Sequence, residues 1–349
     1  MTLPTPVGEA FERQAQACDA LGSPFTARLC RALPAALEGE LRARVAGWPG
    51  EPVADALALR LCGGLHALAR EGRAPALTAA YPPGEGPLEA GLAEAFADHQ
   101  AFLLPWLDSA PQTNEVARSG VLLGGLMEIT RRTRRPLELL EIGASAGLNL
   151  ALDRYSYDLG AAGRWGRARV EIACDWRGTW PDTAAPLAVI SRAACDRAPV
   201  PVRDPAARAR LLAYVWADQS ARLARAEGAL DLVAEAPWQV EEADAADWVE
   251  RRLAAPRPPG SVRVLMHSIM WQYMPAPVQA RIRAAMEQAG AAATEAAPLA
   301  WLEMEADEDR GSAAIRLTLW PGGETRALGR ADFHGRWAEW ALQVRPARG

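Results

Sequence analysis

The chain has 349 residues, and half of them are apolar, which is enough for one large globular domain or two ordinary ones. The net charge of −5 is spread along the chain without a basic run, which argues against a nucleic-acid-binding surface. Every basic residue is arginine, so Walker-type phosphate loops, Schiff-base lysines and Ser-Lys catalysis are excluded.

The five cysteines are an odd number, with no Cys-x-x-Cys pair and no histidine at metal-ligand spacing. We therefore expect reduced core cysteines and no metal site. The N-terminus has no basic region followed by an apolar run, and no uncharged stretch reaches membrane length. The sequence thus predicts a soluble, cytoplasmic protein that does not contact a membrane.

From Gly8 to about Arg135 the apolar residues recur at helical spacing, as Phe11, Ala15 and Cys18 do on one face. Glycine and proline interrupt the pattern at several points, and strand signals are absent. We predict an all-helical N-terminal region over residues 1–110 with four or five helices.

The next helix is expected to begin with a cap in Gln112-Thr113-Asn114-Glu115 and to end near Arg134. It leads into residues 137–142, whose apolar positions indicate a buried strand. Small residues then fill Gly143 to Gly147, so the chain can turn tightly there. A helix N-terminus with free N–H groups is expected after the turn.

Strands and helices alternate through the rest of the chain. The sequence predicts the following elements in order: a candidate strand at 168–176, an apolar run at 187–190 leading to Asp196, a helix at 205–227, a poorly defined strand at 231–240, a helix opening at 242–248, a strand at 262–266, a helix at 276–288, and strands at 299–304, 314–320 and 325–328. This order predicts an α/β domain over residues 111–349, with a mostly parallel sheet and a C-terminal antiparallel hairpin.

The spacing Glu141-x-Gly143-x-Ser145-x-Gly147 resembles the first motif of class I S-adenosylmethionine-dependent methyltransferases. Glycines let the backbone approach a ligand, and an acidic residue after the next strand can accept both ribose hydroxyls. The resemblance implies a Rossmann-like, methyltransferase-type domain with bound S-adenosylmethionine. Asp196 is the candidate ribose ligand, and Asp244-Ala245 correspond to the family's adenine-contacting positions. Ser145 departs from the motif, because a glycine is usual there.

His267, at the end of a predicted strand, is the candidate catalytic base. Asn114, Asn149, Trp271 and Tyr273 are candidates for the walls of a substrate pocket. Each of these residue types also has an ordinary structural role. Histidines at strand ends form hydrogen bonds, aromatic residues pack in cores, and asparagine caps helices.

The same turn also fits Gly-x-Ser-x-Gly, the nucleophile elbow of α/β hydrolases. Ser145 would then be the nucleophile, followed in the required chain order by Asp244 or Asp247 and by His267 or His334. Hydrolases place several strands before the elbow, whereas this chain is helical there. A third alternative is a Rossmann-like binding module without catalysis.

Several longer sequence motifs resemble those of an uncharacterised bacterial family, domain of unknown function 2332. They are Gln-Thr-Asn-Glu at 112–115, the stretch 140–150, Asp-Arg-Tyr at 153–155, Trp-Ala-Asp-Gln at 216–219, His-Ser-Ile-Met-Trp-Gln-Tyr at 267–273 and His-Gly-Arg-Trp at 334–337. The resemblance covers nearly the whole chain and implies a methyltransferase-like fold without a settled activity. Our leading hypothesis is a methyltransferase that acts on a small molecule held between the helical region and the strand ends. The sequence leaves the oligomeric state open.

Overall fold

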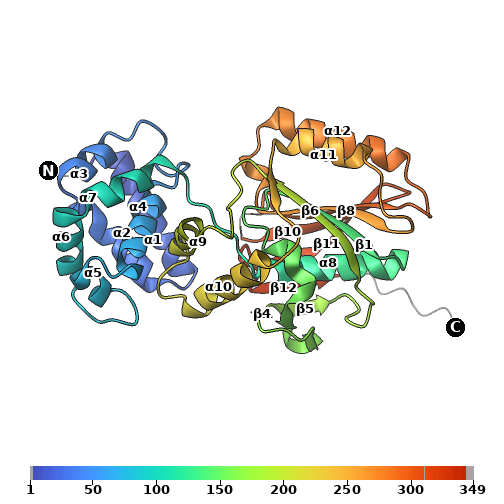
Figure 1. The fold of residues 1–349 in the computed structure, drawn as a ribbon, viewed down its shortest axis with the longest axis horizontal. Coiled ribbons are helices and arrows are strands. Elements are labelled where there is room, and N and C mark those ends of the chain that lie inside the picture. The colour runs from blue at the N-terminus through green and yellow to red at the C-terminus, as the bar shows by residue number, and fades with distance from the viewer. Residues whose placement is uncertain (1–2, 310, 343–349) are drawn as a thin grey trace. The chain divides into compact units, whose positions relative to one another are not determined.

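The computed structural model describes residues 3–309 and 311–342, and the chain forms two compact units (Figure 1). The first unit takes the chain up to Thr113 together with Arg203–Glu227. The second takes Asn114–Val202 and the chain from Gly228 onward. Residues 203–227 were predicted to belong to the sheet domain, whereas they form part of the helical unit in the structure.

The first unit is built from helices. They are α1 (Thr5–Ala20), α2 (Pro24–Ala36), α3 (Gly39–Ala46), α4 (Leu57–Arg70), α5 (Pro75–Ala80), α6 (Leu88–Asp98), α7 (Gln100–Leu103), the 3-10 helix η1 (Leu104–Asp108), α9 (Pro205–Ala213) and the start of α10 (Ser220–Ala234). The predicted stripe of α1 is confirmed, because Phe11, Ala15 and Cys18 are fully buried.

Residues 203–227 are held in the first unit by polar contacts. The Asp218 carboxylate accepts hydrogen bonds from Ser23 Oγ at 2.5 Å and from the Phe25 backbone N–H at 2.8 Å, and so caps α2 from a distant part of the chain. His66 Nδ1 donates to the Ala213 carbonyl at 3.0 Å. These contacts explain the assignment of this segment.

The second unit contains a large mixed sheet and a small one. Its strands are β1 (Leu137–Ile142), β2 (Ser156–Asp158), β3 (Arg164–Trp165), β4 (Glu171–Ala173), β5 (Asp175–Thr179), β6 (Val189–Asp196), β7 (Val240–Glu242), β8 (Val262–Ser268), β9 (Leu299–Ala306), β10 (Ala313–Trp320), β11 (Glu324–Ala331) and β12 (Trp337–Ala341). Among the described residues, the large sheet has the order β5-β12-β11-β10-β9-β8-β1-β6-β7, and β3-β2-β4 form the small one.

The strands β7-β6-β1-β8-β9 are all parallel and follow the 3-2-1-4-5 order of doubly wound folds. β10 and β11 then pair antiparallel, which confirms the predicted C-terminal hairpin. Because β6 and β8 pair with opposite sides of β1, the direction of winding reverses there. Ligands of such sheets bind outside the carboxyl ends of the strands at this switch point.

Helices cover both faces of the sheet (Figure 1). α11 (Ala245–Ala254) and α12 (Ala276–Ala291) lie on one face and share a core with β1 and β8. α8 (Arg118–Thr133) lies on the other. Gly124 of α8 leaves room for an indole there, since a Cβ at this position would lie 2.2 Å from Trp340.

Three sequence predictions are wrong in detail. α8 begins at Arg118 rather than with a cap in 112–115. The predicted strand at 231–240 does not form over most of its length, because α10 continues to Ala234 and the strand β7 covers only Val240–Glu242. The turn at 143–147 leads into a short 3-10 helix, η2 (Asn149–Arg154), instead of an α-helix. The short 3-10 helices η3 (Gly160–Ala162) and η4 (Trp271–Tyr273) complete the unit.

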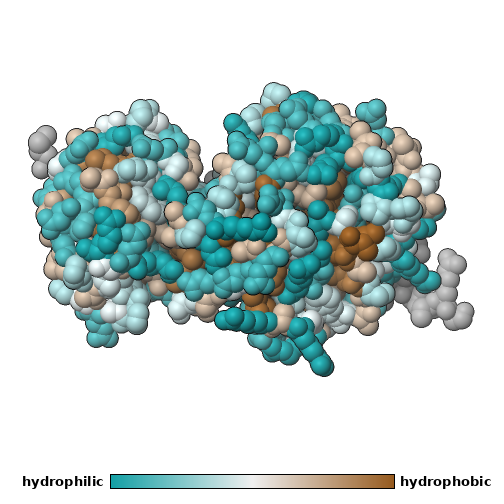
Figure 2. Space-filling model, in the orientation of Figure 1, coloured by the Kyte–Doolittle hydropathy of each residue, from teal (hydrophilic) through white to brown (hydrophobic). Residues whose placement is uncertain are grey.

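On the face shown in Figure 2, hydrophilic residues predominate and apolar residues are confined to scattered patches. Within the described part of the chain, no helix has both the length and the apolar character that crossing a bilayer requires.

Candidate functional site

The turn after β1 is shaped by three residues with left-handed backbone. Gly143, Ser145 and Gly147 have φ values of +63°, +54° and +73°. Gly143 could not carry a side chain, because its Cβ would lie 2.7 Å from Met270 Cε. Ser145 does carry one, at a backbone cost of about 1–2 kcal/mol. A hydrogen bond from the Gly147 N–H to the Ala144 carbonyl, 2.7 Å long, closes the turn.

Asp196, the last residue of β6, fixes this turn. Its carboxylate accepts a hydrogen bond from the Ser145 backbone N–H at 2.8 Å and another from the Ala198 N–H at 2.9 Å. These charge-assisted bonds offset the strain at Ser145. A carboxylate has about four acceptor positions, so it retains capacity for further donors. The side chain is half-buried at the strand end.

Asn114 and Asn149 lie on the other side of the turn. Asn114 Oδ1 accepts a hydrogen bond from the Leu148 N–H at 3.0 Å, so this residue supports the turn instead of capping α8. Asn149 opens η2 and is 2% exposed. The structure therefore brings both predicted pocket residues to the turn that carries the motif.

Within the described part of the chain, three buried polar atoms around the turn have no hydrogen-bond partner: Glu141 Oε2, Ser145 Oγ and Asn149 Oδ1. Burial, together with the nearby Asp196 charge, raises the pKa of Glu141 to about 8, against an opposing effect of Arg118. Buried polar groups in native proteins are nearly always paired. A group of unpaired ones at the switch point of a doubly wound sheet can receive the donors and acceptors of a ligand.

Asp244 and Ala245 lie where β7 leads into α11. The Asp244 carboxylate accepts from the N–H groups of Ala246 at 2.9 Å and Asp247 at 3.2 Å, which makes it the N-cap of the helix. The Ala243 N–H donates to the Asp196 carbonyl at 3.0 Å and so joins the ends of β7 and β6. Ala245 is buried in the core below.

His267 on β8 is completely buried, and both ring nitrogens are used. Nε2 accepts a hydrogen bond from Trp301 Nε1 at 2.9 Å. Because the indole N–H can only donate, the ring proton resides on Nδ1, which donates to Glu305 at 2.7 Å. This neutral, fully paired imidazole connects β8 to β9 and has no free nitrogen for the role of a base.

The two aromatic candidates differ in position. Trp271 is 9% exposed, stacks on His267 with ring centroids 5.0 Å apart, and lines a groove beside β9. Tyr273 is 75% exposed and does not line that groove. Glu305, which the sequence analysis missed, accepts from His267 and from the Met270 and Trp271 N–H groups. Its signal was present in Trp301-Leu-Glu-Met-Glu305, where acids alternate with apolar residues along a strand.

The residues named for a hydrolase do not form a triad in the described part of the chain. Ser145 Oγ has no hydrogen-bond partner, so no base contacts it. Asp247 pairs with Arg281 at 2.7 Å, and His267 is paired as above. His334 lies in the turn after Asp332, whose carboxylate accepts its backbone N–H.

Comparison with protein families gives a match over most of the chain. The family described as "Uncharacterized protein conserved in bacteria (DUF2332)" matches residues 8–340. Comparison with curated proteins and with solved structures finds no match. The match spans both units and confirms the membership expected from the sequence. The chain belongs to this bacterial family of uncharacterised proteins.

Proposed function

We propose that the second unit binds S-adenosylmethionine at the carboxyl ends of β1, β6 and β7 and transfers its methyl group to a small molecule. One observation carries the proposal. The 3-2-1-4-5 order puts Glu141, the turn 143–147, Asp196 and Asp244 at neighbouring strand ends. An acidic residue at the end of the second strand is the usual partner of ribose hydroxyls in such folds.

The side chains around the turn suit an adenosyl ligand. Asp196 has acceptor capacity left for ribose hydroxyls after its two backbone hydrogen bonds. Glu141, with its raised pKa, holds a proton near neutral pH and offers a donor and an acceptor. Asn149 and Ser145 contribute the unpartnered Oδ1 and Oγ atoms.

When bound, the cofactor supplies a methyl group on a sulfonium that is open to in-line displacement. The contribution of the chain is to orient the reactants, which is the main requirement of such a transfer. His267 is not included in this proposal as a base, because both of its nitrogens are engaged within the core. An acceptor that is neutral before the transfer needs no base to activate it.

Calorimetric titration with S-adenosylmethionine and S-adenosylhomocysteine tests the proposal. We expect micromolar binding, weakened about 10- to 100-fold in Asp196→Asn through loss of a charged acceptor. The matched control is Asp182→Asn. Asp182 is an exposed aspartate that also accepts a hydrogen bond from an N–H two residues on, that of Ala184. It lies near Arg131 in the last turn of α8, which leads into the start of β1 and not its carboxyl end.

Asn149→Ala separates ligand binding from support of the turn. The unpartnered oxygen contributes no hydrogen bond to the fold, so any loss of stability in thermal melting comes from lost packing and from Nδ2, whereas the affinity should fall if the oxygen contacts the ligand. No binding of either compound at millimolar concentration would refute the proposal. Binding without turnover of any acceptor would identify a binding module instead of an enzyme.

A further inference from the structure

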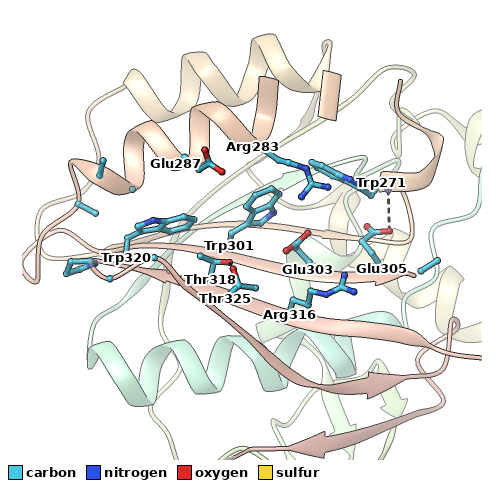
Figure 3. A pocket seen from close by; sticks show the side chains of 17 residues that line it. Trp271, Arg283, Glu287, Trp301, Glu303, Glu305, Arg316, Thr318, Trp320 and Thr325 are labelled. Carbon is cyan, nitrogen blue, oxygen red and sulfur yellow. Dashed lines mark hydrogen bonds between the residues drawn. The ribbon is translucent and has the colours of Figure 1, made fainter. Parts of the chain in front are cut away.

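A groove separate from the turn at β1 lies between α12 and the face of β9, β10 and β11 (Figure 3). Its volume is about 720 Å³, within the range of small-molecule sites. Three tryptophans, Trp271, Trp301 and Trp320, line it together with acidic and basic side chains from α12, β9 and β10. The groove belongs entirely to the second unit.

The aromatic walls are held in place from behind. Trp271 and Trp301 have ring centroids 5.6 Å apart at an interplanar angle of 58°. Both rings contact the buried His267, the first by stacking and the second by its N–H. Gly290 and Gly323 make room for Trp320, since a Cβ at either would lie within 3 Å of the indole. A ligand therefore meets a half-buried Trp320 ring that is already positioned, which lowers the entropic cost of binding.

Glu303 contributes a largely buried negative charge to the groove. Its side chain is 12% exposed, and within the described residues the only basic group within 4.0 Å is His267 Nε2. That nitrogen accepts the Trp301 N–H and carries no proton. Among the described residues, Glu303 therefore forms no ion pair with a charged basic group within 4.0 Å, and its carboxylate is left to pair with a ligand.

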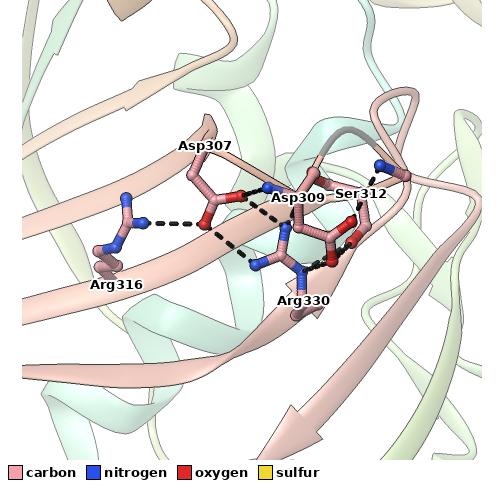
Figure 4. A network of polar contacts seen from close by, with 6 residues as sticks. Asp307, Asp309, Ser312, Arg316 and Arg330 are labelled. Atoms are coloured by element: carbon pink, nitrogen blue, oxygen red, sulfur yellow. Dashed lines mark hydrogen bonds and ion pairs between the residues drawn. The ribbon is translucent and has the colours of Figure 1, made fainter.

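The two arginines of the groove do not neutralise Glu303. Arg316 is directly opposite Glu303 in the β9–β10 register, but it pairs with Asp307 at 3.0 Å. Asp307 is itself held by Arg330 in a network at the end of the hairpin (Figure 4). Arg283 lies over the Trp271 ring at 4.9 Å, which indicates that these aromatic faces accommodate a cation.

We propose that this groove binds a small organic cation that carries an aromatic ring. Its ammonium group pairs with Glu303, and its ring packs against the half-buried Trp320. A carboxylate beside indole faces favours a cation through a charge-assisted hydrogen bond and cation–π attraction. An anion of the same shape would be repelled by Glu303 and by Glu287 at the rim. This site is independent of the proposed methyl transfer.

Titration calorimetry on the full chain with three indoles of similar size tests the proposal: tryptamine as the cation, tryptophol as the neutral analogue and indole-3-acetate as the anion. We expect tryptamine to bind at least tenfold more tightly than indole-3-acetate, with tryptophol between them. Glu303→Gln should weaken tryptamine binding tenfold or more. The control Glu295→Gln, at an exposed position between α12 and β9 and outside the lining of the groove, should change it less than threefold.

Absence of saturable tryptamine binding, or equal or tighter binding of indole-3-acetate, would overturn the proposal. So would equal effects of Glu303→Gln and Glu295→Gln. If Glu303→Gln fails to fold, as judged by circular dichroism, Trp320→Leu replaces it as the test. This variant removes a half-buried ring from the groove and should weaken tryptamine binding at least threefold, and unchanged affinity would equally refute the site.

Discussion

Two glutamates of the second unit form a matched pair, because each is 2% exposed but only one has a basic partner. Burial by itself would raise the pKa of Glu128. Its carboxylate, however, accepts hydrogen bonds from Arg131 at 2.7 Å and Arg132 at 2.5 Å, and these outweigh burial, so the pKa is lowered overall. Glu141 has no such partner, and burial raises its pKa to about 8. Replacement of each by glutamine should therefore change stability in opposite directions.

The pH dependence of the free energy of unfolding follows from the difference in the pKa of Glu141 between the folded and unfolded states. Between pH 4.5, the ordinary value for the carboxyl, and about pH 8, Glu141 is protonated in the folded protein and ionised in the unfolded chain. Unfolding releases a proton there, so stability falls as the pH rises through this window. The loss amounts to about 3 kcal/mol at pH 7 and to less than about 1 kcal/mol at pH 5.

Glutamine imitates the protonated carboxyl, so we expect Glu141→Gln to be more stable than the natural protein by about 3 kcal/mol at pH 7, with a much smaller gain at pH 5. Glu128→Gln should lose about 1–3 kcal/mol at pH 7, because two arginines lose a charged partner. Urea unfolding at pH 5, 7 and 8.5, followed by tryptophan fluorescence and circular dichroism, measures both differences. A destabilised Glu141→Gln at pH 7, or a gain that does not grow with pH, would refute the reasoning.

Three further predictions concern other parts of the chain. Burial lowers the pKa of His66 to about 4, so the free energy of unfolding of the first unit should fall by about 3 kcal/mol as the pH falls from 6.5 to 4. An NMR titration of His66 with a midpoint near 6.5 would contradict this. Gly143→Ala should destabilise the second unit by at least about 1 kcal/mol in thermal melting, whereas Gly8→Ala, with open space and no positive φ, should be neutral or stabilising by up to about 1 kcal/mol. Burial raises the pKa of Cys174 to about 12 and also raises the pKa of Cys195. Neither thiol should therefore react with iodoacetamide at pH 8 until the protein unfolds. Mass spectrometry after trypsin digestion would reveal any modification of the folded protein.

Local patterns in the sequence were sufficient to predict the strands at the centre of the sheet. The strand 137–142 and its turn were predicted with their observed bounds, because apolar spacing and small residues determine both. Asp196 was expected just past a strand and is the last residue of β6. The segment 231–240 was mispredicted because Val233, Trp238 and Val240 favour strands, although Val233 is buried on the helix α10.

Contacts between distant residues could not be predicted in the same way. The placement of 203–227 depends on Asp218 reaching Ser23, which is 195 positions earlier. The paired state of His267 depends on the β8–β9 register, which sets it opposite Glu303 and close to Glu305. Strand-end position alone therefore suggested a reactive histidine, whereas the neighbouring strand supplies the partners that make it structural.

The interleaving of the two units has a consequence for how the chain folds during synthesis. When Thr113 leaves the ribosome, the helical unit still lacks α9, the Asp218 cap of α2 and the carbonyl that receives His66. About ninety residues of the other unit, Asn114–Val202, must emerge before those partners exist. The N-terminal helices therefore remain without the Asp218 cap on α2 after β1 and β6 have already been synthesised and can pair. We expect the two units to complete their folding together and not one after the other.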